Sequence, residues 1–111
     1  MTNLSYERLA FTCPCCGFVG LKYRPYANAS GVGLIRGLTP PYDTYFGDPS
    51  YEVCACCGFE FGNDDSDPPP TSFEESLLRF VARNELWLDP KKKPLKWSLQ
   101  EQLYNAAIQV K

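Results

Sequence analysis

CPCCGF at residues 13–18 and CACCGF at residues 54–59 are near-repeats of one motif, and they decide the fold. Each contains a C-x-x-C pair followed directly by glycine, at Gly17 and Gly58. Zinc binds four soft donors in a tetrahedron, and two C-x-x-C turns supply four thiolates about 2.3 Å from the metal. Glycine permits the positive φ that such a turn commonly needs. The sequence therefore predicts one metal site, with the ligands Cys13, Cys16, Cys54 and Cys57.

Each motif also contains a third cysteine, Cys15 in the first and Cys56 in the second. Using either as a ligand would replace the two-residue spacing by a C-x-C or a vicinal C-C pair, which bends poorly around one small ion. We therefore expect two free thiols at matching positions of the two turns, acting as small turn residues with weak S–H donors. A redox or second-metal role for Cys15 and Cys56 is the alternative.

The donor set also bears on the identity and role of the metal. Four thiolates suit zinc or a single rubredoxin-type iron, and zinc is preferred because it needs no redox partner. Four cysteines close the coordination sphere, whereas a catalytic zinc keeps one position open for water. The chain contains no histidine, so the commonest general base and catalytic-zinc ligand are both missing. We expect a structural zinc ion, no catalytic residue and no enzymatic activity, with iron as the main alternative.

Short segments rich in aromatic and β-branched residues flank the cysteines, as half-buried strands do. They lie at 8–12, 18–23, 50–53 and 59–61, with a further short strand expected at 32–35. The prolines at 68–70 then end this region, because proline cannot continue a strand or enter a helix interior. The expected fold is small α+β: a zinc-ribbon-like antiparallel β region with two C-terminal amphipathic helices.

The two helices are predicted from their caps and from apolar periodicity. Ser72 and Ser98 can each cap a helix, and each has a glutamate three residues later, as in a capping box. The apolar stripes recur at helical spacing and comprise Phe73, Leu77, Phe80, Val81 and Leu88 in the first helix and Leu99, Leu103, Ala106, Ala107 and Val110 in the second.

The predicted organisation has two parts. Residues 1–70 form a four-cysteine zinc-ribbon-like domain with a long loop insertion at 24–49, and residues 71–111 form a two-helix extension packed on it. The insertion is expected to be packed down by its own aromatic residues, namely Tyr26, Tyr42, Tyr45 and Phe46. A binding surface on this loop is the alternative.

The charge distribution argues against nucleic acid as a partner. The chain has 11 basic and 13 acidic residues, for a formal net charge of −2. From Gly37 to Leu78 it has no lysine or arginine but nine acidic residues. Nucleic-acid binders rely on clustered basic residues, so this acidic segment favours a basic protein partner. No signal peptide or apolar membrane span is recognised. We therefore expect a cytoplasmic protein, where six cysteines favour metal binding over disulfides.

Three further groups of residues are expected to be structural. Asp64, Asp65 and Asp67 lack the spacing of a calcium loop and are expected to be solvated turn residues. Trp87 and Trp97 are expected in the core or at a helix-docking surface. The lysines between the helices are expected to form a solvated linker, and they are Lys91, Lys92, Lys93 and Lys96.

The two motifs, the segment SYEVCACCGFE at 50–60 and the pair Asp64-Asp65 together resemble the bacterial cysteine-rich CPCC domain family. The resemblance covers roughly residues 8–85, with Ala55 where the family commonly has proline and a longer insertion at 23–49. It implies a zinc-ribbon or rubredoxin-like knuckle pair with the same four cysteine ligands, and it brings no established activity. The leading hypothesis is a non-catalytic, zinc-stabilised protein-interaction module whose acidic surface binds a basic protein partner, for example in an immunity- or inhibitor-like role toward a toxin or nuclease. The alternatives are a rubredoxin-like electron-transfer protein and a thiol redox or metal sensor acting through Cys15 and Cys56.

Overall fold

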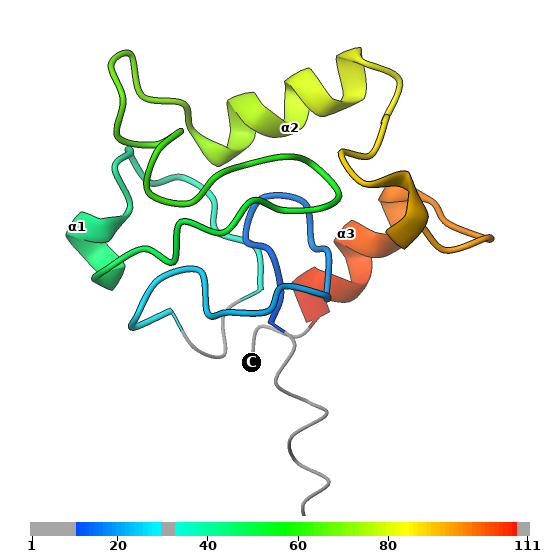
Figure 1. Ribbon diagram of the computed structural model, residues 1–111, viewed down its shortest axis with the longest axis horizontal. Helices are drawn as coiled ribbons and strands as arrows, with labels where there is room; N and C mark the ends of the chain where they lie inside the picture. Colours follow the sequence, from blue (N-terminus) through cyan, green and yellow to red (C-terminus); the bar gives the residue numbers. More distant parts are fainter. Residues whose placement is uncertain (1–10, 30–32, 109–111) are drawn as a thin grey trace, which may run out of the picture.

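The computed structural model of the chain describes residues 11–29 and 33–108. Its helices are α1 (Asp43–Phe46), α2 (Phe73–Ala82), the 3₁₀ helix η2 (Pro90–Lys92) and α3 (Leu99–Ile108). The rest of the described chain is loop, and the two cysteine loops lie at the centre of the molecule (Figure 1). α2 runs along one side of these loops and α3 lies at another. Within the described ranges, no helix has the length and apolar character to cross a bilayer.

The predicted antiparallel β region is wrong. Across residues 11–29 and 33–108 there is no β-strand. Backbone pairing there consists of three isolated antiparallel bridges, which join Phe11 to Leu21, Tyr26 to Pro49 and Val53 to Glu60. The parts of the predicted strands at 8–10 and at 32 lie outside the described residues. The two C-terminal helices of the prediction are present as α2 and α3.

The chain forms a hairpin around each cysteine motif, closed by the Phe11–Leu21 bridge in the first and the Val53–Glu60 bridge in the second. One local feature beside each bridge keeps the pairing from extending into a strand. The carboxylate of Glu52 accepts the backbone N–H groups of Lys22 and Tyr23, at 2.9 and 3.0 Å, so a side chain replaces a neighbouring strand as their acceptor. Tyr51 has φ 63°, in the left-handed region, which interrupts an extended backbone just before the second hairpin. β-Branched and aromatic composition marks residues that fit a sheet, but it does not show where their N–H groups find acceptors.

The start of α2 follows the predicted capping box. The Ser72 hydroxyl accepts from the N–H of Glu75 at 3.0 Å, and the Glu75 carboxylate accepts from the N–H of Ser72 at 3.2 Å. The helix ends earlier than its apolar stripe suggested, because Asn84 and Glu85 adopt φ 62° and 55°. Leu88 therefore lies beyond α2 and is exposed, so its place in the buried stripe was predicted wrongly.

The other stripe positions divide between interior and surface. Phe73 and Phe80 of α2 are buried and Leu77 is half-buried, whereas Val81 is exposed. In α3, the Ser98 hydroxyl caps the N–H of Glu101 at 3.1 Å. Along that helix the buried side chains are Leu99 and Ala106, with Leu103 half-buried and Ala107 exposed, and Val110 lies outside the described residues.

Aromatic side chains build the core around the cysteines, as predicted for the loop insertion. Tyr26 and Tyr42 are fully buried and Phe46 is half-buried, although Tyr45 is exposed. Tyr42 stacks on Phe73 of α2, with ring centroids 4.0 Å apart and planes 5° from parallel. This stack attaches the insertion to the C-terminal part of the chain, since aromatic pairs stabilise beyond the area that they bury.

The two tryptophans join the segment after α2 to the start of α3. Trp87 is buried, Trp97 is half-buried, and their rings meet edge to face with centroids 5.4 Å apart. Phe18, the last residue of the first cysteine motif, contacts Trp87 in the same edge-to-face manner. The expectation that both tryptophans are core or docking residues is confirmed.

Asp65 is not a solvated turn residue. Its side chain is fully buried, and its carboxylate accepts from the Tyr26 hydroxyl at 2.9 Å, the Tyr42 N–H at 3.0 Å and the Gly62 N–H at 2.8 Å. Asp64 is half-buried and accepts from the N–H of Glu60, and only Asp67 of the three is exposed as expected. Asp65 therefore joins three separate stretches of loop from the inside.

Candidate metal centre

The two cysteine motifs fold into the same turn. In the first, the Gly17 N–H donates to the Cys13 carbonyl at 2.9 Å, and the Cys13 N–H donates to the Phe18 carbonyl at 2.7 Å. The second repeats both bonds, from Gly58 to Cys54 at 2.9 Å and from Cys54 to Phe59 at 3.0 Å. The two glycines have φ 88° and 83°, in the left-handed region that glycine adopts without a steric cost. We call these turns knuckle 1 (residues 13–18) and knuckle 2 (residues 54–59).

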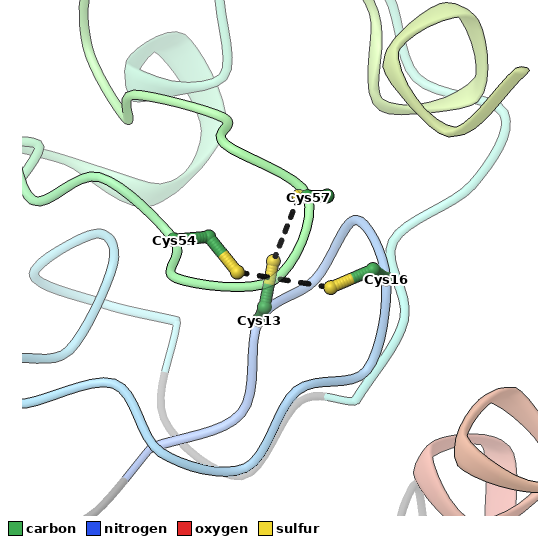
Figure 2. Close-up of side chains that lie close together, drawn as sticks. All are labelled: Cys13, Cys16, Cys54 and Cys57. Atoms are coloured by element: carbon green, nitrogen blue, oxygen red, sulfur yellow. Dashed lines mark hydrogen bonds between the residues drawn. The ribbon is translucent and has the colours of Figure 1, made fainter. Parts of the chain in front are cut away.

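The knuckles face each other and bring four sulfur atoms together. The Sγ atoms of Cys13, Cys16, Cys54 and Cys57 all lie within 4.8 Å of one another. Two of the pairs cross between the knuckles, with Cys13 and Cys57 at 4.0 Å and Cys16 and Cys54 at 3.7 Å (Figure 2). A tetrahedral ion with Zn–S bonds of about 2.3 Å requires S–S separations of about 3.8 Å. The four sulfurs therefore have a spacing that could hold one such ion.

The four buried sulfurs can be thiolates together only if a cation joins them. All four cysteines are buried, Cys57 being the most exposed at 3%. Burial raises the pKa of the Cys13 and Cys16 thiols, because a thiolate loses its hydration there. Burial also opposes ionisation of Cys54, but hydrogen bonds from the neighbouring thiols outweigh it and lower the pKa of Cys54. Ionisation of all four groups therefore requires a compensating positive charge at the centre of the cluster.

Hydrogen-bond donors from outside hold each knuckle in place. In knuckle 1 the Arg36 guanidinium donates to the carbonyls of Pro14 and Cys15, at 3.0 and 2.7 Å. The equivalent carbonyls of knuckle 2 accept the N–H groups of Asp89 and Leu88, at 2.9 and 3.2 Å. Equivalent carbonyl groups of the two turns thus accept hydrogen bonds, from an arginine side chain in knuckle 1 and from the main chain in knuckle 2.

The third cysteine of each knuckle points into the protein interior. Cys15 and Cys56 are both fully buried. The Cys15 thiol donates to the carbonyl of Phe73 at the start of α2, at 3.3 Å, and the Cys56 sulfur accepts from the side-chain amide of Gln102 in α3, at 3.6 Å. Matching positions in the two turns therefore contact different helices. These contacts agree with the expected role as small packing residues with weak hydrogen bonds.

Besides Arg36, sequence reasoning missed two polar side chains near this centre. Gln102 contacts both knuckles, and the available clue was its spacing from Leu99 and Ala106, which places all three on one face of a helix. Arg83 donates to the carbonyl of Cys57 at 3.0 Å from just beyond α2. Nothing in the pattern around Arg83 distinguishes it from a solvated arginine.

No family model, curated protein or solved structure matches this chain. The resemblance to the CPCC family therefore stays a prediction, and the sulfur geometry supports the metal site independently of it.

Proposed function

We propose that the chain binds one structural zinc ion through Cys13, Cys16, Cys54 and Cys57, and that the metal-stabilised fold is a non-catalytic protein-interaction module. One observation carries the metal-binding part: four buried sulfur atoms from two matching turns lie within 4.8 Å of one another. Four thiolates leave a zinc ion without an open position for water or substrate. The absence of histidine from the chain supports the same non-catalytic role.

The metal would supply folding free energy that the rest of this fold lacks. The described residues have no β-strand, and the knuckles themselves are closed by few backbone bonds. Structural zinc contributes about 10–16 kcal/mol of binding free energy in zinc-finger peptides at neutral pH. A contribution on that scale is comparable to the total stability of a typical small domain, about 5–15 kcal/mol. The ion would therefore determine whether the knuckles fold.

Elemental analysis of the purified protein tests the metal proposal directly. We expect one zinc per chain, lost in serine variants of a ligand such as Cys13 or Cys54. Cys15→Ser and Cys56→Ser are the matched controls from the same turns and should retain the metal. A red protein containing iron would instead support the rubredoxin-like alternative, and a protein purified without any bound metal would refute the proposal.

The interaction role rests on the charge distribution. The segment from Gly37 to Leu78 contains nine acidic residues and no basic one. Several of these carboxylates accept backbone N–H groups within the fold, as Glu52 and Asp65 do, but an ionised carboxylate still adds to the negative potential outside the protein. The exposed members are Asp43, Asp48, Asp67 and Glu75. Such a field favours a basic partner.

Charge reversal at exposed positions tests this role without disturbing the interior. Asp43, Asp48 and Asp67 can be changed together to lysine, and Lys91 and Lys92 to glutamate in a control bait. We expect the wild-type and control baits to capture a basic protein that the lysine variant does not capture. Identical captured proteins for all three baits would contradict the electrostatic part of the proposal.

A further inference from the structure

Gln102, in the middle of α3, connects the two knuckles through a single side chain. Its Nε2 donates to the carbonyl oxygen of Cys16 in knuckle 1 at 2.9 Å and lies 3.6 Å from the Sγ of Cys56 in knuckle 2. Its Oε1 accepts from the indole N–H of Trp97 at 2.8 Å. The third bond fixes which way the amide points, so both N–H donors are directed at the knuckles.

The two acceptors of Gln102 are not candidate ligand atoms, but they lie in the two turns that carry those ligands. Cys16 is one of the four candidate ligands, and Cys56 lies between the ligands Cys54 and Cys57. One amide group can reach both acceptors only while the knuckles are held against each other. The sulfur pairs that cross between the knuckles are the contacts that a bound ion would hold at that separation.

α3 also packs unusually close to knuckle 1. A Cβ atom at Gly17 would lie 3.0 Å from both the Cβ of Ala106 and the backbone oxygen of Gln102. Leu99 and Ala106 are buried on the same face of the helix. The helix therefore rests on the backbone of the turn that carries Cys13 and Cys16, and a shift of that turn would be transmitted directly to α3.

The corresponding contact from Arg83, just beyond the end of α2, reaches only one knuckle. Arg83 donates to the carbonyl of Cys57, which is the position in knuckle 2 that matches Cys16 in knuckle 1. Its guanidinium otherwise lies over the ring of Phe80, 5.6 Å from the centroid. The Arg83 contact therefore depends on knuckle 2 alone, whereas the Gln102 contacts depend on how the two knuckles are arranged.

We propose that Gln102 is a positioning residue for the metal centre and that it couples metal occupancy to the docking of α3. The proposal rests on the proposed binding of a metal by the four cysteines. Hydrogen bonds behind metal ligands commonly set metal affinity, and their removal costs about 10- to 100-fold. Coupling between two events is reciprocal, so metal removal should release α3 and a loosened α3 should weaken metal binding.

A methionine substitution isolates the amide from the packing. Gln102→Met keeps the length of the side chain but removes both donors and the acceptor, and Gln100→Met, at an exposed site on the same helix, is the matched control. Competition with a coloured zinc chelator should show about 10- to 100-fold weaker zinc binding for Gln102→Met and an unchanged affinity for Gln100→Met. Equal affinities for the two variants would overturn the proposal.

Hydrogen exchange of the wild-type protein provides a test that needs no variant to fold. With zinc bound, the backbone amides of α3 should be protected, and they should exchange rapidly after the metal is removed by chelation. In zinc-loaded Gln102→Met, α3 should exchange faster while cobalt substitution still gives the absorption of a tetrahedral four-thiolate site. Equal protection of α3 with and without metal would overturn the coupling. Wild-type protein that binds no metal would overturn the proposed function as well.

Discussion

Replacing Asp65 by asparagine tests whether this buried carboxylate, which is not one of the candidate metal ligands, holds the loops together. Its oxygens accept three hydrogen bonds, two at Oδ2 from the Tyr26 hydroxyl and the Tyr42 N–H and one at Oδ1 from the Gly62 N–H. Asparagine has nearly the same shape but only one acceptor oxygen. If that oxygen keeps the two bonds at Oδ2, the new amide NH₂ faces the Gly62 N–H, so donor meets donor.

The expected loss follows from the bond that asparagine cannot make. A hydrogen bond to a charged group contributes about 1.5–3 kcal/mol, and a buried donor left without an acceptor costs about 1–3 kcal/mol. Removing the charge offsets part of this loss, because a buried carboxylate pays for its desolvation. We expect a net destabilisation of about 2 kcal/mol, or a factor of about 30 in the folding equilibrium. Asp65→Ala removes both acceptor oxygens and all three hydrogen bonds, and it should cost about 4 kcal/mol or more.

Urea unfolding of the metal-loaded protein measures these losses, followed by the tryptophan signals of Trp87 and Trp97. Asp67→Asn is the matched control, since Asp67 is exposed in the same loop and surface changes usually stay within about 0.5 kcal/mol. The midpoint should fall for Asp65→Asn and stay constant for Asp67→Asn. If Asp65→Asn were as stable as the control, the saved desolvation would outweigh the lost bond, and the assigned role of Asp65 would be wrong.

Three further predictions follow from the same structure. Gly17→Ala should destabilise the protein more than Gly58→Ala by about 1–3 kcal/mol in urea unfolding: both residues have positive φ, but only at Gly17 would a Cβ lie 3.0 Å from atoms of α3. Burial raises the pKa of Tyr42 to about 12. The neutral hydroxyl of Tyr42 therefore contributes its full stabilisation below pH 10, and this stabilisation should be lost as the pH rises through 12. Alkaline unfolding should accordingly show a smaller loss of stability with pH for Tyr42→Phe than for the wild-type protein. Cys15 and Cys56 are fully buried, so alkylation of zinc-loaded protein should modify them only as fast as the protein opens; rapid selective labelling of both would instead favour the thiol-chemistry alternative.

The helix starts and the grouping of the cysteines could be predicted because both depend on residues close in sequence. A capping box is made by two side chains three residues apart, and Ser72 and Glu75 form it as their spacing indicates. A C-x-x-C-G turn likewise contains its own hydrogen bonds, so the two copies fold alike. Two such turns commonly supply four thiolates to one metal ion, and the structure brings those four sulfurs together.

The strands and the acidic loop were misjudged because their structure depends on partners far along the chain. The N–H groups of Lys22 and Tyr23 bond to Glu52, about 30 residues away, and this removes the donors that a strand would need. Asp65 looks like part of a solvated acidic run, yet its partner Tyr26 is 39 residues away. The residues next to Asp65 in the sequence do not indicate that its side chain is buried, because they are acidic and polar as in an exposed turn.

These long-range carboxylate bonds and the sulfur cluster stabilise the fold in complementary ways. The described chain is mostly loop, so many backbone N–H groups have no helix or strand to accept them and must find other acceptors. Glu52, Asp64 and Asp65 each supply such an acceptor, while a metal at the four sulfurs would join the two knuckles that the carboxylates do not connect. Residues 11–29 and 33–108 contain no strand, and their loops can still be rigid if both the carboxylate bonds and the metal fix them. It follows that chelation and loss of Asp65 should disrupt different parts of the molecule: the first separates the knuckles and α3, and the second frees the insertion around Tyr26 and Tyr42.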